Sequence, residues 1–333
     1  MKKKIVSLML AAAMVATVAI GCGNGGSAPA SSSAAAGSSA AAAKTIKVGV
    51  INNDPNESGY RKANDEDLRK TFTKENGYEA EFVNVKENAD MIKAADKFIT
   101  DGVDYILLAA ADTAGWDATL KKAQDAKVKV ILFDRMIDAD ESLYETAIVS
   151  DMAQEGKDAV AWLESQKLEK YNIIHIQGKM GTDAQKGRTG ALDEKVKADP
   201  NWTIVKQQTG NWSAEEAEKV VNSVIKKDFN VIYAENDDMA KGAVAALDKA
   251  NIKHGVGEKV IVMGFDCNKW ALQELEKKAW NFDGQCNPFQ SSYIVETIKK
   301  LEAGEKVEKK QIMKEKTFDA TTITKEDIEK YGI

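Results

Sequence analysis

The sequence predicts an α/β protein made of two similar lobes, each with a parallel sheet covered by helices. Between residues 46 and 265, short apolar runs of strand length alternate with amphipathic stretches of helical period. Regular alternation of this kind produces parallel sheets with helices on both faces. The pattern forms two blocks that change over near Ser150, which favours two lobes over one large sheet. A single barrel of about this size is the alternative that the pattern leaves open.

The first 22 residues have the three parts of a secretory signal. Residues 2–4 are all Lys, residues 5–20 are apolar, and small residues precede a cysteine. Cys22 follows Gly21 as in a bacterial lipobox, where cleavage precedes the cysteine and lipid is attached to its sulfur. A plain signal peptide with an incidental cysteine is the alternative. The apolar run is too short to predict a transmembrane helix.

Residues 23–43 contain only Gly, Ser, Ala, Asn and one Pro. This composition cannot build a packed core, so we expect a flexible tether. Such a tether after a lipid anchor would hold a folded domain away from a membrane surface. The folded part is expected to begin at residue 44.

The two blocks supply the elements of the two lobes in turn. Runs rich in Val, Ile and Leu predict the strands, and Ala-rich or amphipathic stretches predict the helices. In the first block we expect strands at 46–51, 79–85, 103–109 and 128–133, and helices at 59–76, 89–100 and 113–126. In the second we expect helices at 152–166, 184–198, 214–227 and 239–250, and strands at 172–177, 203–208, 230–234 and 260–265.

Polar and aromatic side chains gather where the predicted strands end. Ligands of open α/β sheets bind beyond the carboxyl ends of the strands, so these residues are candidates for one site. Planar polar groups form paired hydrogen bonds with hydroxyls, and aromatic rings cover C–H faces, a mixture that suits a sugar. Each residue alone could instead be a turn residue or a core aromatic. The set includes Asn52, Glu57, Tyr60, Arg61, Asp134, Arg135, Arg188, Asn211, Trp212, Asn236, Asp237, Asp266 and Gln285.

The stretch 231–250 shows one of these strand ends in detail. An apolar run at 231–234 is followed by four polar residues and then by an Ala-rich helical segment. Asn236 can both donate and accept hydrogen bonds, which suits a ligand made of hydroxyls. The alternative is that Asn236 and Asp237 only cap the helix.

Composition and charge exclude several classes of function. The chain is 44% hydrophobic and 29% charged, with a net charge of −6, so nucleic acid is not an expected partner. His175 and His254 have no Cys or His at metal-ligand spacing, so we expect neither a metal site nor a cofactor. We also find no nucleophilic serine motif and no phosphate-binding loop.

Several motifs resemble the type I periplasmic sugar-binding proteins of ABC transporters, in their ribose and galactose branch. The resemblance covers the chain from about residue 44 to its end. Its main pieces are Phe133-Asp134-Arg135, residues 233–243, and Val262-Met263-Gly264-Phe265-Asp266. Residues 57–61, 113–116 and 134–144 are similar to the galactofuranose-binding members. In those members Trp stands where this chain has Tyr60, and a Glu is expected where it has Gln285.

The resemblance implies two Rossmann-like lobes joined by a three-strand hinge that closes around a monosaccharide. The chain would cross between lobes near Ser150, Gln285 and Met313. The amino-terminal lobe would comprise 44–150 and about 286–313, and the carboxyl-terminal lobe 151–285 and about 314–333. The implied ligand-binding residues are Tyr60, Arg61, Asp134, Arg135, Arg188, Trp212, Asn236, Asp266 and Gln285.

The resemblance also implies a partner and a location. The protein would be a monomer outside the cytoplasm, anchored to the membrane by lipid on Cys22, and would deliver its sugar to an ABC permease. A sugar sensor for a membrane receptor is one alternative. A glycan-acting enzyme is another, although Arg135 beside Asp134 would keep that carboxylate ionised, which suits hydrogen bonding better than acid catalysis. A repressor would need an amino-terminal DNA-binding segment where this chain has a signal and a tether.

Cys267 and Cys286 each directly follow a proposed ligand residue, Asp266 or Gln285. We therefore predict that they lie close together, with Cα atoms within roughly 7 Å if they can form a disulfide. Two buried free thiols are the alternative.

Overall fold

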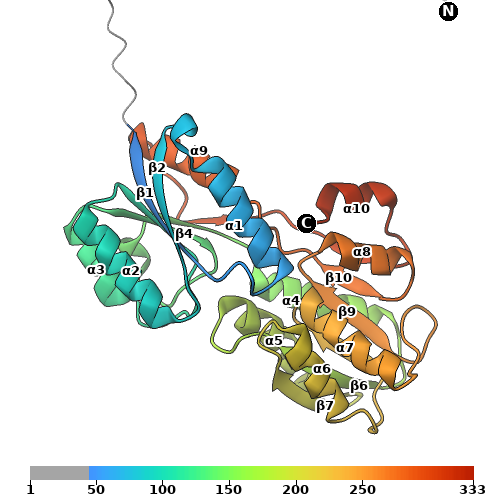
Figure 1. Cartoon of the computed structure of the whole chain (residues 1–333). Coiled ribbons are helices and arrows are strands. Elements are labelled where there is room, and N and C mark those ends of the chain that lie inside the picture. The colour runs from blue at the N-terminus through green and yellow to red at the C-terminus, as the bar shows by residue number, and fades with distance from the viewer. Residues whose placement is uncertain (1–44) are drawn as a thin grey trace, which may run out of the picture. The chain divides into compact units, whose positions relative to one another are not determined.

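The computed structural model describes residues 45–333, in which strands and helices alternate along the chain (Figure 1). The predicted signal peptide with Cys22, and the tether at 23–43, lie outside the described residues. The strands are β1 (Ile46–Asn52), β2 (Tyr78–Asn84), β3 (Tyr105–Leu108), β4 (Lys129–Asp134), β5 (Thr146–Val149), β6 (Tyr171–Gln177), β7 (Trp202–Thr209), β8 (Val231–Ala234), β9 (Ile261–Phe265), β10 (Phe282–Gly284), β11 (Lys310–Ile312) and β12 (Thr317–Asp319). The helices are α1 (Gly59–Thr71), α2 (Asn88–Asp101), α3 (Asp117–Asp125), α4 (Met152–Ser165), α5 (Asp183–Ala198), α6 (Ala214–Asn222), α7 (Asp237–Lys249), α8 (Lys269–Glu276), α9 (Ser291–Glu302) and α10 (Lys325–Tyr331), with 3-10 turns η1 (Lys74–Asn76) and η2 (Glu141–Leu143).

The strands form two six-stranded sheets with the same internal order. The first sheet has the order β11-β5-β4-β3-β1-β2, and the second has the order β12-β10-β9-β8-β6-β7. Neighbouring strands are parallel except β10 and β12, which run antiparallel. Two separate parallel sheets confirm the predicted two-lobe α/β fold and exclude the single barrel.

Helices cover both faces of each sheet, because successive residues of a strand point to opposite faces. Ile106 of β3 packs in one hydrophobic cluster with Phe98 of α2, whereas its neighbour Leu107 packs in another with Leu68 of α1. In the second lobe, α4 and α5 cover one face, and α6, α7 and α8 cover the other. Burial on both faces explains why these strands appear in the sequence as continuous apolar runs.

Three segments carry the chain between the lobes. β5 of the first sheet leads through Ser150 into α4, β10 of the second sheet leads through 285–290 into α9, and β11 leads through 313–316 into β12. α9 therefore lies beside α1 (Figure 1), where Thr71 Oγ1 and Ser291 Oγ are 2.8 Å apart. The two lobes are each built from separate parts of the sequence.

Some predicted helices are shorter than expected for local reasons. α1 ends at Thr71 rather than at 76, because the chain tightens into η1 and leaves through Gly77, whose φ is +87°. α3 begins at Asp117 rather than at 113. Side-chain bonds hold the preceding residues in a turn, since Thr113 Oγ1 donates to Asp138 Oδ2 at 2.5 Å.

A pair of buried carboxylates, Asp237 and Asp283, joins α7 to β10 in the second lobe. Asp237 Oδ2 accepts hydrogen bonds from Asn268 N (2.7 Å) and Nδ2 (3.1 Å), and Asp283 Oδ1 accepts one from Cys267 N (3.3 Å). Among the described residues, no backbone or amide donor reaches the other oxygen of either carboxylate, and the two carboxyl groups interact with each other. Burial raises the pKa of Asp283 to about 8 and, together with the charge of Asp283, raises the pKa of Asp237.

This pair should make the protein less stable as the pH rises. The folded state holds a proton that an unfolded chain, with an Asp pKa of about 3.9, has already lost. The retained proton stabilises the folded state, and this stabilisation is complete in acid. It is lost as the pH rises from about 4 to about 8, because the free energy of unfolding falls by about 1.4 kcal/mol for each pH unit in that window. We expect Asp283→Asn to flatten the pH dependence of the free energy of unfolding, measured in urea between pH 5 and 8.5.

Asp228→Asn is the matched control, since the Asp228 side chain is 84% exposed on the same lobe. A wild-type slope that persists unchanged in Asp283→Asn would contradict the assignment.

Candidate ligand-binding site

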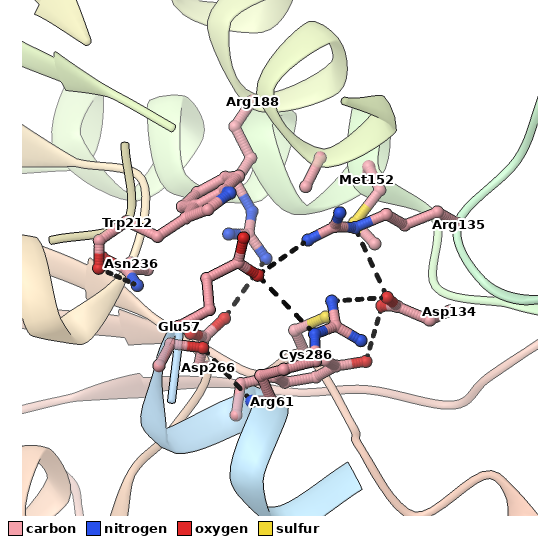
Figure 2. A pocket seen from close by; sticks show the side chains of 13 residues that line it. Glu57, Arg61, Asp134, Arg135, Met152, Arg188, Trp212, Asn236, Asp266 and Cys286 are labelled. Carbon is pink, nitrogen blue, oxygen red and sulfur yellow. Dashed lines mark hydrogen bonds and ion pairs between the residues drawn. The ribbon is translucent and has the colours of Figure 1, made fainter. Parts of the chain in front are cut away.

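A small cavity lies between the two lobes and is lined by residues that follow strands of both sheets (Figure 2). Its volume is about 30 Å³, which is room for little more than one water molecule. Ligand pockets usually measure roughly 300–1,000 Å³. The lining residues are Glu57, Ser58, Tyr60, Arg61, Asp134, Arg135, Met152, Ala184, Arg188, Trp212, Asn236, Asp266 and Cys286. Every predicted ligand residue except Gln285 is among them.

Asp134 is at the centre of the polar network of the first lobe. Its Oδ2 lies 2.7 Å from Arg61 Nη2 and 3.4 Å from Arg135 Nε, and its Oδ1 accepts a hydrogen bond from Tyr60 Oη at 2.8 Å. Burial alone would raise the pKa of Asp134, but the charges of Arg61 and Arg135 outweigh it and hold the pKa below its usual value. Asp134 is therefore an ionised hydrogen-bond acceptor, as predicted.

Arg188 organises the second lobe in a similar way. Its Nε and Nη2 each lie 2.7 Å from Glu155 Oε2, and Nη2 lies 3.6 Å from Asp266 Oδ1. Its Nη1 donates to the carbonyl oxygen of Glu235. The guanidinium carbon stands 4.5 Å from the centre of the Phe265 ring. Together these contacts hold a buried positive charge in one orientation at the edge of the cavity.

Three lining residues have backbone conformations that are rare outside glycine. The φ angles of Asp134, Trp212 and Asp266 are +65°, +64° and +106°. Each residue lies at or just beyond the end of a strand. Strain of this kind persists only where surrounding contacts impose it, and it is concentrated at ligand sites.

Trp212 lies flat against Gly178 and needs a glycine there. A Cβ atom at residue 178 would stand 1.8 Å from the indole ring, so any other side chain would displace the ring. Trp212 is buried, and its Nε1 has no hydrogen-bond partner among residues 45–333. Buried donors are rarely left unpaired, so this N–H is available to pair with a ligand oxygen.

Asn236 caps a helix, which is one of the two roles that the sequence allowed for it. Its Oδ1 accepts a hydrogen bond from Met239 N at 2.9 Å and so caps α7. Its Nδ2 lies 3.5 Å from the carbonyl oxygen of Trp212 at the wall of the cavity. Asn236 therefore caps the helix and also lines the site, whereas Asp237 has its contacts with Asn268 and Asp283 instead.

Glu57 occupies the middle of the cavity (Figure 2). It is one of the polar residues that follow the first predicted strand, but it is not among the ligand-binding residues that the family resemblance implies. Its Oε2 lies 3.7 Å from Arg61 Nε and 3.6 Å from Arg135 Nη2. The carboxylate thus bridges two arginines of the first lobe. The four-residue spacing of Glu57 and Arg61 was the signal that could have indicated this contact.

Gln285 is the predicted ligand residue that the structure places elsewhere. Its Oε1 accepts a hydrogen bond from Lys316 N at 3.2 Å, and it lines a separate cavity on the hinge. The next residue, Cys286, lines the ligand cavity instead. Adjacent side chains of an extended segment point to opposite sides, which explains the exchange. We therefore replace Gln285 with Cys286 in the candidate site.

Cys267 and Cys286 are buried and form no disulfide, so the structure agrees with the alternative of two free thiols. Both belong to one cluster of packed residues in the second lobe. Their predicted Cα separation stays a prediction.

Hydrogen bonds between the two lobes hold them together. Asp238 Oδ2, in the first turn of α7, accepts from Gly59 N at 3.0 Å, and Asp183 Oδ2, in the first turn of α5, accepts from Met136 N at 3.0 Å. In both pairs the acid belongs to the second lobe and the backbone amide to the first. The structure is therefore an arrangement in which the lobes are drawn together.

Comparisons with known proteins agree with this geometry. Residues 28–306 match the Periplasmic binding protein domain family. A fructose import binding protein of Bifidobacterium longum is 31% identical over 96% of this chain and 95% of its own length. A galactofuranose-binding protein of Escherichia coli is 34% identical over 60% of this chain and 65% of its own. A Mycobacterium smegmatis protein crystallised with β-D-fucofuranose is 30% identical, with a TM-score of 0.77 over 83% of this chain and 92% of its own.

The chain belongs to the periplasmic binding protein family, and its two lobes have the type I fold. The resemblance to the sugar-binding proteins of ABC transporters is confirmed. Members of the family are solute-binding proteins rather than enzymes, so the glycan-acting enzyme is no longer an alternative. The family also places the protein outside the cytoplasm.

Proposed function

We propose that the protein captures one monosaccharide, galactofuranose or a related aldose, between its closing lobes. The main support is the set of buried charged groups that face one cavity from both lobes, Arg61, Asp134 and Arg135 from the first and Arg188 and Asp266 from the second. Planar charged groups of this kind bind vicinal hydroxyls in pairs. A furanose ring is supported by two of the compared proteins, since one is named for galactofuranose and the other was crystallised with β-D-fucofuranose.

Capture requires the lobes to separate, because a cavity of about 30 Å³ cannot admit a sugar. A groove of about 760 Å³ beside the cavity shares Glu57, Ser58 and Trp212 with it, and would be the route of entry. The sugar hydroxyls would take the place of the Glu57 carboxylate between Arg61 and Arg135. The ring of Trp212 would cover the apolar face of the sugar.

Titration calorimetry with a panel of pentoses and hexoses tests this proposal. The panel should include methyl β-galactofuranoside and methyl β-galactopyranoside, which are locked in one ring form each. We expect binding of one equivalent of an aldose that can form a furanose, and weaker binding of the locked pyranoside. If no monosaccharide binds to the folded protein, the proposal fails.

We further propose that the captured sugar is delivered to an ABC permease. Deletion of the gene should then abolish uptake of the sugar that calorimetry identifies. A sensor for a membrane receptor would instead lose the transcriptional response to that sugar while its uptake continues. Radiolabelled uptake measured in the deletion strain separates these two outcomes.

We also propose that Cys22 carries the lipid anchor, since it follows a secretory signal and precedes a core-less tether. Within residues 45–333, no helix combines the length and the apolar character needed to cross a bilayer. Cys22→Ala should therefore release the protein from the membrane fraction or block its processing, as measured by fractionation and immunoblotting. Unchanged membrane attachment would rule out this anchor.

A further inference from the structure

A cluster of polar side chains lies where the three crossings between the lobes come together. Ser150 lies on the first crossing, Cys286 on the second and Glu315 on the third, and Glu155 belongs to the first turn of α4. Ser150 Oγ donates to Glu315 Oε1 at 2.5 Å and stands 3.5 Å from Cys286 Sγ. These four residues, called the hinge cluster below, connect all three crossings.

Three members of the hinge cluster bring metal-ligating atoms together. A carboxylate oxygen of Glu155, Sγ of Cys286 and a carboxylate oxygen of Glu315 lie within 4.8 Å of one another. In a tetrahedral zinc site with bonds of about 2.0 Å to oxygen and 2.3 Å to sulfur, such atoms are roughly 3.3–3.5 Å apart. Modest side-chain rotations would therefore bring the three atoms to coordination distance.

In each carboxylate of the hinge cluster, one oxygen accepts hydrogen bonds from protein donors. The second oxygen can then bind a further partner. Glu315 Oε1 accepts hydrogen bonds from Ser150 Oγ and from Asn287 N at 2.7 Å. Glu155 Oε2 accepts from Arg188 Nε at 2.7 Å. Outer partners that fix the orientation of a ligating side chain in this way are typical of metal sites.

Glu155 supplies an independent indication of a missing partner. Its side chain is 5% exposed, and its Oε1 has no hydrogen-bond partner among the described residues. The Glu155 carboxyl group also interacts with the Cys286 thiol, which places this carboxyl group next to the other members of the hinge cluster. A buried carboxylate oxygen without a partner is costly, and a cation would remove that cost.

We propose that the hinge cluster binds one divalent cation of the zinc type through Glu155, Cys286 and Glu315. The Ser150 hydroxyl or a water molecule would complete a four-ligand shell. One thiolate with two carboxylates favours Zn²⁺ over Mg²⁺ and Ca²⁺, which prefer oxygen ligands alone. The Cys286 thiol releases its proton to water when the cation binds.

A cavity on the outer side of the hinge gives the cation a path to this site. The cavity has a volume of about 220 Å³, and both Glu155 and Glu315 line it. Asp151, Asp158 and Lys316 also line it, and its acidic side chains outnumber the one lysine, which would favour the entry of a cation. This path is separate from the sugar cavity, although Cys286 lines that cavity as well.

Titration with Co²⁺ tests the proposal directly, because Co²⁺ substitutes for Zn²⁺ and reports a bound thiolate by its near-ultraviolet charge-transfer absorption. The full chain with Cys22→Ala, in which Cys267 and Cys286 are the only thiols, is treated with a chelator and then titrated. We expect the absorption to saturate at one equivalent and to disappear when Zn²⁺ is added. Zn²⁺ at a hundredfold excess over its Kd should raise Tm by roughly 5 °C.

Cys286→Ala and Glu315→Gln are expected to lose both the stoichiometric absorption and the shift in Tm. Cys267→Ala is the matched control and should keep them, since Cys267 is the other buried free thiol and is not a member of the hinge cluster. Glu315→Gln keeps the size of the side chain and carries the test if Cys286→Ala does not fold. The proposal is overturned if the parent chain shows no saturating absorption, or if Cys286→Ala retains it.

Discussion

Asp134→Asn is expected to weaken sugar binding by roughly 10–100-fold, because a charge-assisted hydrogen bond contributes about 1.5–3 kcal/mol. The neutral amide can no longer hold Arg61 and Arg135, whose nitrogens lie 2.7 and 3.4 Å from Asp134 Oδ2. Asn is a sharper test than Ala, because it tolerates the φ of +65° at this residue. Calorimetry gives the change in affinity, and thermal unfolding shows whether the fold survives.

Asp125→Asn provides a matched control in the same lobe. The Asp125 side chain is 66% exposed and pairs with Lys121 on the surface, where such pairs contribute little. The Asp125→Asn variant should leave both the sugar affinity and Tm nearly unchanged. If the folded Asp134→Asn variant binds sugar as tightly as the wild type, Asp134 has no part in the ligand site.

Trp212→Ala should cost a similar 10–100-fold in affinity, since it removes an aromatic contact and the apolar area that the ring covers. Trp212→Phe separates two contributions of this residue. It keeps an aromatic ring against Gly178 but lacks the buried Nε1 donor that has no protein partner in the described chain. A loss of about fivefold to tenfold for Trp212→Phe would correspond to the roughly 1 kcal/mol of one hydrogen bond.

Trp202→Phe is the control for these two variants. Trp202 is equally buried in the second lobe and stacks on Tyr171 with ring centres 4.2 Å apart, but it does not line the cavity. This variant should lower Tm without changing sugar affinity. A Trp212→Ala variant that binds sugar normally would show that the ring is only part of the core.

The sequence predicted those residues of the candidate site that lie at the ends of strands, because it predicted where the strands end. Asp134 and Asp266 end or directly follow apolar runs, and parallel strands bring such positions to one edge of a sheet. Arg188 lies within α5, the helix that follows β6, so the strand end made it a candidate, and the resemblance to a family implied its role in binding. Glu57 was only one of several polar candidates in the irregular loop between β1 and α1, where no periodic pattern indicates which side chain points into the site.

Extended segments between the lobes mark the limit of such reasoning. Gln285 and Cys286 are adjacent, and a change of one position along the chain moves a side chain from the ligand cavity to the opposite side. A strand that is buried on both faces has apolar residues at successive positions. Its sequence therefore does not reveal which of two adjacent side chains points into the cavity. Only the packed hinge shows that Cys286 faces the cavity.

The sequence by itself determined the α/β class, the two repeated blocks and the strand ends that carry most of the candidate site, because those features depend on local periodicity and on polar residues next to apolar runs. The tertiary structure decided which distant residues meet. Glu155, Cys286 and Glu315 come from one helix and two separate crossings, and Asp237 and Asp283 pair across a strand and a helix. The first contact arises where the crossings pack together in the hinge, and the second arises from packing within the second lobe. No spacing along the chain encodes either of them.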